Sequence, residues 1–522
     1  MRARLVSVAA LAIVLLTGSV EAKTFRWAND GDVNSMDPYA RNETFLLSFL
    51  GNIYEPLVRR DRDLKVEPAL ARRWSNPKPD VWRFELRPGV TFSDGTPFTA
   101  DDVVFSVERA RGPGSNVANK VQSVKEVRKI DALTVEFVTD GPNPILVEEI
   151  ADLYIMSKAW AERHNAVRTA DMTTKEENYA TRNAMGTGPF VLVSREPDRR
   201  TVLRPNPTWW DEAEHNLTEV EFVVVSNDAT RVAALMSGQI DMIYTVPPQD
   251  MARLGRMAEI RLLQRPETRT VFFGFDQHRD ELLKSNVKGR NPFKDARVRR
   301  AFYQAIDIEA IAARVMRGQA MPTALMIAPS IRGFDPKLNI RHPHDMAAAR
   351  ALLAAAGYAD GFAVTLDCPN DRYVNDEAIC NAVAAMLARI GVKVDVVAQA
   401  RARYFAEVLG LKASFYLLGW APSTYDAHNV LFNLIGTREG KQGQFNLGRY
   451  SNARIDALID QIATETNDTR RNALIGEAMR IHHEEVGHIP LHQQFVAWAV
   501  RRNIELVQPA DNTFPLRYVV VK

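Results

Sequence analysis

The segment Trp82–Ala110, with the sequence WRFELRPGVTFSDGTPFTADDVVFSVERA, carries the clearest local signals of structure in this chain. Its first residues alternate apolar and polar side chains, as a half-buried strand does, and a Pro-Gly turn follows. A short strand and an Asp-Gly turn come next. Thr99 is placed to cap a helix whose first turn carries Asp101 and Asp102, where the helix dipole favours acidic side chains. The segment therefore predicts two strands and a capped helix, joined by tight turns.

The length and composition of the chain are those of a folded protein with more than one domain. At 522 residues it is too long for a single hydrophobic core, and two or three domains are expected. The apolar fraction of 46% and the charged fraction of 25% are ordinary for globular proteins. A formal net charge of +2 gives no reason to expect binding to nucleic acid or to a membrane surface.

The N-terminus predicts export. Arg2 and Arg4 precede the apolar stretch Leu5–Leu16, which is too short to span a bilayer. Val20–Ala22 places small residues at the two positions that a signal peptidase reads, so cleavage is predicted after Ala22. No cysteine lies near this site, which argues against a lipoprotein anchor. No later run of apolar residues reaches transmembrane length.

The two cysteines, Cys368 and Cys380, lie in one short segment. An oxidising compartment allows them to pair, and two thiols alone make a poor metal site. We predict a structural disulfide between them.

The later part of the chain alternates strand and helix patterns, which indicates βα units around a mixed sheet. The first strand of the chain is expected at residues 24–27, and a helix with apolar residues at helical spacing at 42–54. Further strands are expected at 271–275, 362–366 and 392–397, and further helices at 295–306, 345–356 and 375–389.

The segment Trp82–Ala110 also resembles the diagnostic region of the family 5 extracellular solute-binding proteins, the dipeptide- and oligopeptide-binding components of ABC importers. Further landmarks of that family follow in the expected order. They are Gly186–Phe190, Arg204–Trp210, Ala233–Asp241, Asn291–Phe302, Ala305–Asp307 and Ala351–Tyr358. The resemblance extends from residue 24 to the C-terminus.

The resemblance implies an α/β fold of the periplasmic-binding-protein type (type II, cluster C). Two lobes are hinged by crossing strands, an extra subdomain is inserted in lobe I, and Ile489–Phe495 returns the chain to lobe I. The implied division is a signal peptide (1–22), lobe I (23–55, 185–271 and 493–522), the inserted subdomain (56–184) and lobe II (272–492).

The resemblance further implies a periplasmic substrate-binding protein that is not an enzyme and needs no cofactor or metal. Such a protein captures a peptide or peptide-like solute between closing lobes and delivers it to permease subunits in the inner membrane. We expect a monomer. Two alternatives remain open: the same fold with a non-peptide cargo (an opine-like conjugate, a metal chelate or a sugar-derived compound), and an exported peptidase or other hydrolase.

A peptide-like zwitterion requires a cation for its carboxylate, and arginine suits this role because its planar fork meets a carboxylate in two parallel bonds. Arg372 follows a predicted strand and precedes a predicted helix, so we expect it at the cleft. The resemblance assigns an arginine at this position to the ligand carboxylate. The alternative is a surface arginine that pairs with Asp371 or Asp376.

The loop after the apolar run Phe415–Leu418 is the second predicted part of the site. Relatives carry their amine-binding aspartate three residues after the tryptophan, where this chain has Ser423. Either Asp426 replaces that aspartate, or the ligand has no amine at this point. Trp420 is expected either as a wall of the pocket or in the core. The predicted ligand-binding residues are Asn34, Arg372, Trp420, Ser423, Tyr425, Asp426 and His428.

Other patterns in the sequence indicate structure rather than chemistry. His483 and His488 are five residues apart, whereas the zinc-protease pattern needs four, so no metal site is predicted there. No Gly-x-Ser-x-Gly motif is present, and the Gly-Thr-Gly-Pro turn lacks the lysine of a phosphate loop. Arg297, Arg299 and Arg300 are expected on a solvated helix face.

Overall fold

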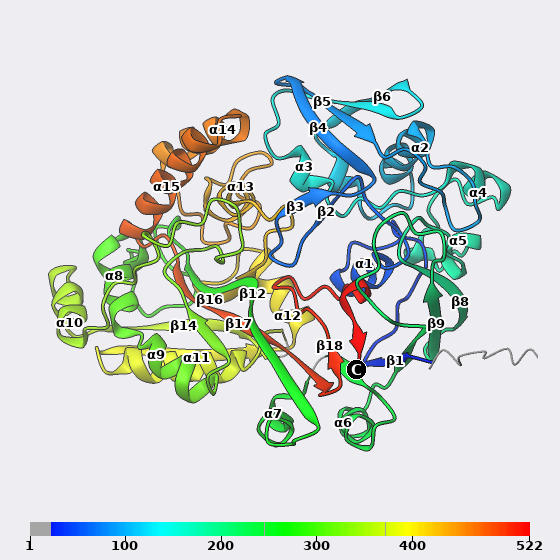
Figure 1. Ribbon diagram of the computed structural model, residues 1–522. Coiled ribbons are helices and arrows are strands. Elements are labelled where there is room, and N and C mark those ends of the chain that lie inside the picture. Colours follow the sequence, from blue (N-terminus) through cyan, green and yellow to red (C-terminus); the bar gives the residue numbers. More distant parts are fainter. Residues whose placement is uncertain (1–21, 245, 371) are drawn as a thin grey trace, which may run out of the picture.

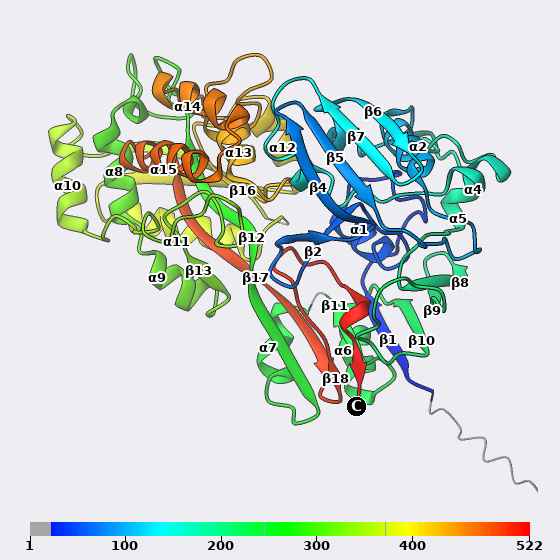
Figure 2. The same ribbon diagram turned by 45° about the horizontal axis from the view of Figure 1, so that its top comes forward.

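The computed structural model describes residues 22–244, 246–370 and 372–522. Apart from Ala22, the predicted signal peptide lies outside the described residues. Figures 1 and 2 show two α/β lobes side by side, joined by the long strands β12 (Ile260–Phe275) and β17 (Ile489–Arg501). The lobe that contains the N-terminal strand is called lobe I here, and the other lobe II. The expected two-lobed α/β fold is confirmed.

One large sheet runs through both lobes. Eleven strands of the described residues belong to it, and β12 and β17 form its centre. These two strands pair antiparallel along most of their length, with register shifts between Pro266 and Thr270 and between Val271 and Phe272. The shifts interrupt the ladder where the strands pass from one lobe to the other. Irregularities of this kind allow a strand to bend.

The other strands of this sheet divide between the lobes. On the lobe I side are β11 (Met242–Tyr244), β1 (Thr24–Asn29), β10 (Glu219–Val224), β9 (Arg200–Pro205) and β8 (Phe190–Glu196). On the lobe II side are β16 (Phe415–Trp420), β14 (Phe362–Pro369) and β15 (Val392–Gln399), with β13 (Ala320–Pro322) paired to β17.

An aromatic core in lobe I joins segments from both ends of the chain. Trp27 on β1 is fully buried and contacts Phe49 on α1 (Thr44–Leu50), with ring centroids 5.8 Å apart. Phe514 from the C-terminal segment packs edge-on against the same indole at 4.7 Å. Around this core lie the short strands β2 (Val58–Arg60), β3 (Val66–Pro68), β18 (Ile504–Glu505) and β19 (Val520–Val521), whereas α6 (Asp228–Ser237) and α7 (Pro248–Leu254) pack in a separate apolar cluster of lobe I.

A separate four-stranded sheet, to which the segment Trp82–Ala110 contributes one strand, lies at the top of lobe I beside lobe II (Figure 2). The order is β4 (Ala71–Lys78), β5 (Val81–Leu86), β7 (Thr134–Thr139) and β6 (Val124–Asp131), with α2 (Ala100–Arg111) packed against it. Thr99 caps α2 in a capping box with Asp102, as predicted. The expected short strand between the two turns is only an isolated bridge between Thr91 and Pro97, because three residues separate the turns at 88–89 and 93–95 and leave no room for a ladder.

Arg109 at the end of α2 ties this sheet to the rest of lobe I. Its guanidinium meets Asp37 in two bonds of 2.6 and 2.9 Å, and both side chains are fully buried. A buried bidentate pair fixes relative orientation, since loss of either partner leaves an unpaired charge. Short helices complete the region: α3 (Leu146–Glu149), α4 (Lys158–Arg163) and α5 (Tyr179–Arg182).

The predicted elements of lobe II are confirmed within a few residues. Its helices are α8 (Ala296–Ala305), α9 (Ile308–Ala310), α10 (Met346–Ala355), α11 (Asp376–Ala388), α12 (Arg401–Leu409), α13 (Ala427–Val430), α14 (Ala453–Thr464) and α15 (Asp468–Glu484). Cys368 at the end of β14 and Cys380 in α11 form a disulfide. In the described ranges, no helix is long and apolar enough to cross a membrane.

The expectation that Arg299 lies on a solvated face is wrong. Its side chain is buried and donates to the backbone carbonyls of Phe293, Lys294, Glu485 and Val486. The guanidinium supplies donors to these four backbone carbonyls, which no β-ladder pairs. Burial lowers the pKa of Arg299.

Candidate functional site

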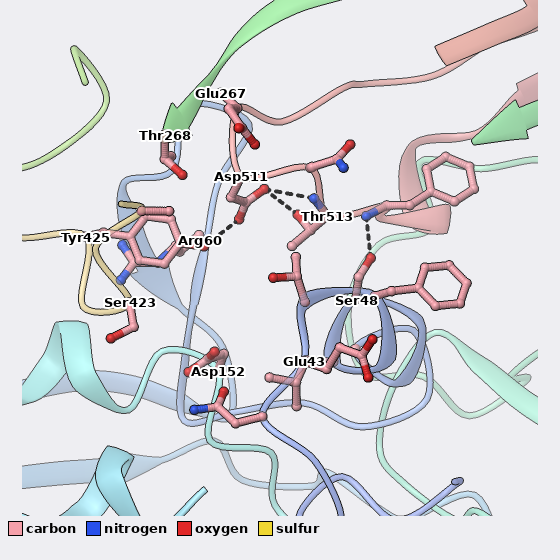
Figure 3. Close-up of a pocket in the computed structure, with 18 of the residues that line it drawn as sticks. Glu43, Ser48, Arg60, Asp152, Glu267, Thr268, Ser423, Tyr425, Asp511 and Thr513 are labelled. Atoms are coloured by element: carbon pink, nitrogen blue, oxygen red, sulfur yellow. Dashed lines mark hydrogen bonds between the residues drawn. The ribbon is translucent and has the colours of Figure 1, made fainter. Parts of the chain in front are cut away.

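A cavity of about 780 Å³ lies between the lobes beside the crossing strand β12 (Figure 3). Lobe I contributes the start of α1, the end of β2 and the loop 511–515. Lobe II contributes Arg372, Tyr373 and the segment 418–425, and β12 contributes residues 267–269. Enclosed clefts of this size, with mixed apolar and polar walls, are typical of small-molecule sites.

The structure brings four of the seven predicted ligand-binding residues to this cavity: Arg372, Trp420, Ser423 and Tyr425. Asp426, His428 and Asn34 do not line it. Asn34 is exposed on the loop after β1, and His428 borders a smaller cavity between the lobes. Residues 421–423 and Tyr425 of the loop after β16 therefore face the ligand space, whereas Asp426 and His428 turn away from it.

Arg372 faces the cavity without a carboxylate partner. No described acidic side chain lies within ion-pairing distance of its guanidinium. The carboxylate of Asp376 instead accepts the backbone N–H groups of Arg372 and Tyr373, each at 3.0 Å. The alternative partner Asp371 lies outside the described residues. Burial and the neighbouring guanidinium of Arg269 lower the pKa of Arg372, so an incoming anion gains from both cations.

Tyr373 connects the segment that carries Arg372 with the end of β16. Its hydroxyl accepts the N–H of Gly419 at 2.8 Å and lies 3.4 Å from the carbonyl of the same residue. A Cβ added at Gly419 would lie 2.8 Å from the ring of Tyr373, which is too close for any side chain. A glycine is therefore required at this position by close approach.

Trp420 combines the two predicted roles. It lines the cavity, packs against Phe445 with ring centroids 4.7 Å apart, and donates from Nε1 to Asn429 at 2.9 Å. Ser423 is exposed at the cavity wall, where its hydroxyl accepts from Asn429 at 3.4 Å.

Tyr425 contacts the opposite lobe. Its hydroxyl donates to Asp511 Oδ2 at 2.9 Å, and the guanidinium of Arg60 lies over its ring at 3.9 Å. Both partners belong to lobe I, so these contacts form only when the lobes are together. The backbone of Tyr425 has a φ of 55°, which is strained for an aromatic residue and is found mostly where function requires it.

Asp426 has a structural role in lobe II. It is fully buried, and its carboxylate meets Arg471 in two bonds of 2.7 Å. It also caps α13 by accepting the N–H of His428 at 2.8 Å. A smaller cavity of about 340 Å³ borders this pair and is lined by Arg471, His428 and Glu149 from lobe I. Burial lowers the pKa of His428 to about 4 and raises the pKa of Glu149.

The sequence analysis missed the acidic residues of the cavity. The lining includes Glu43, Glu55, Asp152, Glu267 and Asp511. Glu55 accepts from the indoles of Trp209 and Trp210, at 3.1 and 2.7 Å, and its burial raises its pKa. Asp511 follows a Gln-Pro-Ala turn in the C-terminal segment, and the predicted return of that segment to lobe I was the signal that it reaches the cleft.

In the described part of the chain, no group of three or more His, Cys, Asp or Glu side chains is arranged to hold a metal ion. His482 at the end of α15 pairs with His488, which follows the helix. His482 Nε2 lies 2.9 Å from His488 Nδ1, and both rings are buried.

Comparison with known proteins gives consistent matches along the chain. The model of "Bacterial extracellular solute-binding proteins, family 5 Middle" matches residues 65–442. The probable deoxycholate-binding periplasmic protein YgiS of Escherichia coli K12 is 26% identical over 95% of this chain and 91% of its own length. The glutathione-binding protein GsiB of Salmonella paratyphi A is 26% identical over 93% of this chain and 92% of its own length.

Among solved structures, that of HbpA2 from Haemophilus parasuis superposes with a TM-score of 0.83 at 23% identity. The match covers 96% of this chain and all of that protein. At this identity the match establishes the shared fold.

Proposed function

The chain belongs to the bacterial extracellular solute-binding proteins of family 5, and from this premise we propose that it captures a small peptide-like solute through a carboxylate held by Arg372. Proteins of this family are substrate-binding components that work with the permeases of ABC importers. A ligand that contacts both lobes stabilises the closed form, which the permease then recognises.

The observation that carries this proposal is the guanidinium of Arg372. It lines the cavity between the lobes, Arg269 is close to it, and its pKa is lowered by burial and by that second cation. A half-buried arginine without a counter-ion is a strong site for a carboxylate, because the planar fork supplies two charge-assisted hydrogen bonds.

The rest of the cavity suits a peptide of a few residues. Its volume of about 780 Å³ lies in the usual range for small-ligand pockets, and Trp420 and Phe445 supply an aromatic wall. The glutathione-binding relative supports a cargo of this chemical class.

Several finer features belong to the same proposal. We propose export with cleavage after Ala22, a free periplasmic protein without a lipid anchor, and a monomer. The proposed division remains lobe I at 23–55, 185–271 and 493–522, the inserted subdomain at 56–184, and lobe II at 272–492. No catalytic step is proposed, and peptide fragments found by mass spectrometry after incubation with intact peptides would contradict this.

Isothermal titration of ligand-free protein with di-, tri- and tetraalanine, glutathione and their C-terminal amides tests the proposal. We expect binding of at least one free acid, weakened by about 2–5 kcal/mol in Arg372→Ala and in the matching amide. Arg62→Ala is the matched control, because Arg62 is exposed, pairs with Glu214 and lies outside the cavity. Unchanged affinity in Arg372→Ala would rule out its assigned role.

A second candidate is a non-peptide carboxylate, bound in the same cavity through the same arginine. Ser423 favours it, because this loop supplies no acid for an amine at the position where relatives carry one. Deoxycholate is the appropriate probe, since the name of a relative includes it. Binding of deoxycholate together with failure of every peptide would replace the first candidate with the second.

A further inference from the structure

Asp511 lies on a rigid loop of lobe I at the cavity wall (Figure 3). The next residue, Asn512, is held through its side chain by Trp498 Nε1 at 2.9 Å and through its carbonyl by the hydroxyl of Tyr244 at 2.6 Å. Phe514 is buried in the aromatic core of lobe I. The loop therefore presents the carboxylate of Asp511 in a fixed position.

The hydrogen-bond donors around Asp511 are all neutral. Oδ1 accepts from the N–H of Thr513 at 3.0 Å and from its hydroxyl at 2.8 Å, and Oδ2 accepts from Tyr425 at 2.9 Å. Within the described residues, no Lys, Arg or His forms an ion pair with it. Arg60, on the face of the Tyr425 ring, pairs with Glu148 at 2.7 Å. Oδ2 keeps an acceptor site, and the negative charge is not compensated.

The other acidic side chains of the cavity differ from Asp511 in this respect. Asp152 pairs with Lys120, and Glu267 pairs with Arg269 at 3.1 Å. Glu55 is enclosed by indole donors and by Arg59 at 3.8 Å. Glu43 has no ion-pair partner among the described residues but is exposed at the start of α1, where water solvates it. Among the described acidic residues of the cavity, Asp511 is thus the half-buried carboxylate that has no cationic partner.

The lobe II loop is shaped to reach Asp511. Tyr425 keeps its strained φ of 55° because its N–H donates to Pro422 at 3.2 Å and its carbonyl accepts from Arg332 at 2.9 Å. This conformation points the phenol at Asp511, two residues beyond Ser423. The loop that carries Ser423 therefore meets a carboxylate from the opposite lobe through Tyr425.

We infer that Asp511 receives the ammonium group of the ligand, so that the cargo is a zwitterion with its carboxylate on lobe II and its amine on lobe I. The inference rests on the proposed function and specifies its ligand class as compounds with a free amine. A ligand with opposite charges at its two ends contacts Arg372 and Asp511 across the cleft. It stabilises the closed form fully only when both of its charged groups are present.

Isothermal titration of the peptides above and of their N-acetylated counterparts tests the inference. Wild-type protein is expected to lose about 30-fold or more in affinity on acetylation, whereas Asp511→Asn binds the two forms within about threefold of each other. Asparagine keeps the acceptor for Thr513, and a thermal melt checks that the variant is folded. Glu212→Gln, at an exposed acidic residue outside the cavity, is the matched control and is expected to discriminate as the wild type does.

The possible results distinguish failure of the role inferred for Asp511 from failure of the proposed function. Asp511→Asn that still discriminates against acetylation, or loss of discrimination in Glu212→Gln, overturns the inference and leaves a peptide-binding protein. Equal wild-type affinity for the acetylated and free forms overturns it as well. Absence of binding to every peptide overturns both the inference and the proposed function.

Discussion

The loop after β16 and the loop before the 3-10 helix at Leu516–Tyr518 each carry an aspartate, but the two carboxylates have opposite environments. Asp426 in the first loop is fully buried and shares two hydrogen bonds with Arg471. Asp511 in the second loop is half-buried at the cavity and contacts only neutral donors. A carboxylate that already holds a cation stabilises the lobe, whereas one without a cation is available to a ligand.

Charge compensation identifies the recognition group better than sequence position does. Asp426 is three residues from Ser423, and Asp511 is 86 residues from Tyr425, yet the distant residue reaches the cavity. The two environments should differ in their effects on the free energy of unfolding, on its pH dependence and on lobe closure.

Loss of the cation beside Asp426 is expected to have the largest effect. Arg471→Ala leaves a buried carboxylate unpaired and should lower the free energy of unfolding by about 3–5 kcal/mol. The adjacent Arg470→Ala is the matched control, because Arg470 is 70% exposed in its pair with Glu465, and its loss should cost no more than about 1 kcal/mol. Urea denaturation of the three proteins measures both changes; equal changes would show that the Asp426 pair is no more important than a surface pair.

The pH dependence of stability should also distinguish the lobe II loop. The pKa of His428 is lowered by burial to about 4, and Asp426, Arg471 and Asp460 are the charges around it. Between pH 6.5 and about 4 the unfolded chain binds more protons than the folded one, so acid lowers stability in this window and the contribution is complete above it.

His428→Gln should remove about 2 kcal/mol of the difference in unfolding free energy between pH 7 and pH 4.5. His278→Gln, at an exposed histidine, serves as the control and should leave the pH profile unchanged. Parallel pH profiles for wild type and His428→Gln would contradict the assignment.

The smallest effect is expected from the contact between the two loops. Tyr425→Phe removes one hydrogen bond that forms only when the lobes meet, worth about 0.5–1.5 kcal/mol. Affinity should fall by about threefold to tenfold for free and N-acetylated ligands alike, because closure is weakened while Asp511 keeps its charge. Titration of both forms measures this, and a loss confined to the free amine would instead place Tyr425 in direct contact with the ammonium group.

Much of the fold follows from local signals in the sequence. The Thr99 cap, the strand at Phe362 and the helix that begins after Asn375 are each specified by neighbours within a few residues, and the structure has them where they were expected. The position of Arg372 at the cavity follows in the same way from a strand end beside a helix start.

The parts that sequence reasoning missed depend on contacts between distant segments. Arg299 lies in a helix pattern that suggests solvent, but its guanidinium is used by carbonyls almost 190 residues away. Asp426 is diverted from the cavity by a partner 45 residues later, Arg471. Local pattern cannot reveal either contact, because both are made by side chains that meet only after the lobe has folded.

The contact between Tyr373 and Gly419 bears on how this cleft can diversify. The hydroxyl of Tyr373 and the missing side chain at Gly419 hold the Arg372 segment and the end of β16 as one unit. Residues 421–424 lie beyond this unit. Mutations there can therefore change the shape of the cavity without disturbing the binding of a carboxylate by Arg372. Proteins with this arrangement can evolve to bind ligands that differ in the part next to this loop while keeping the carboxylate that Arg372 binds.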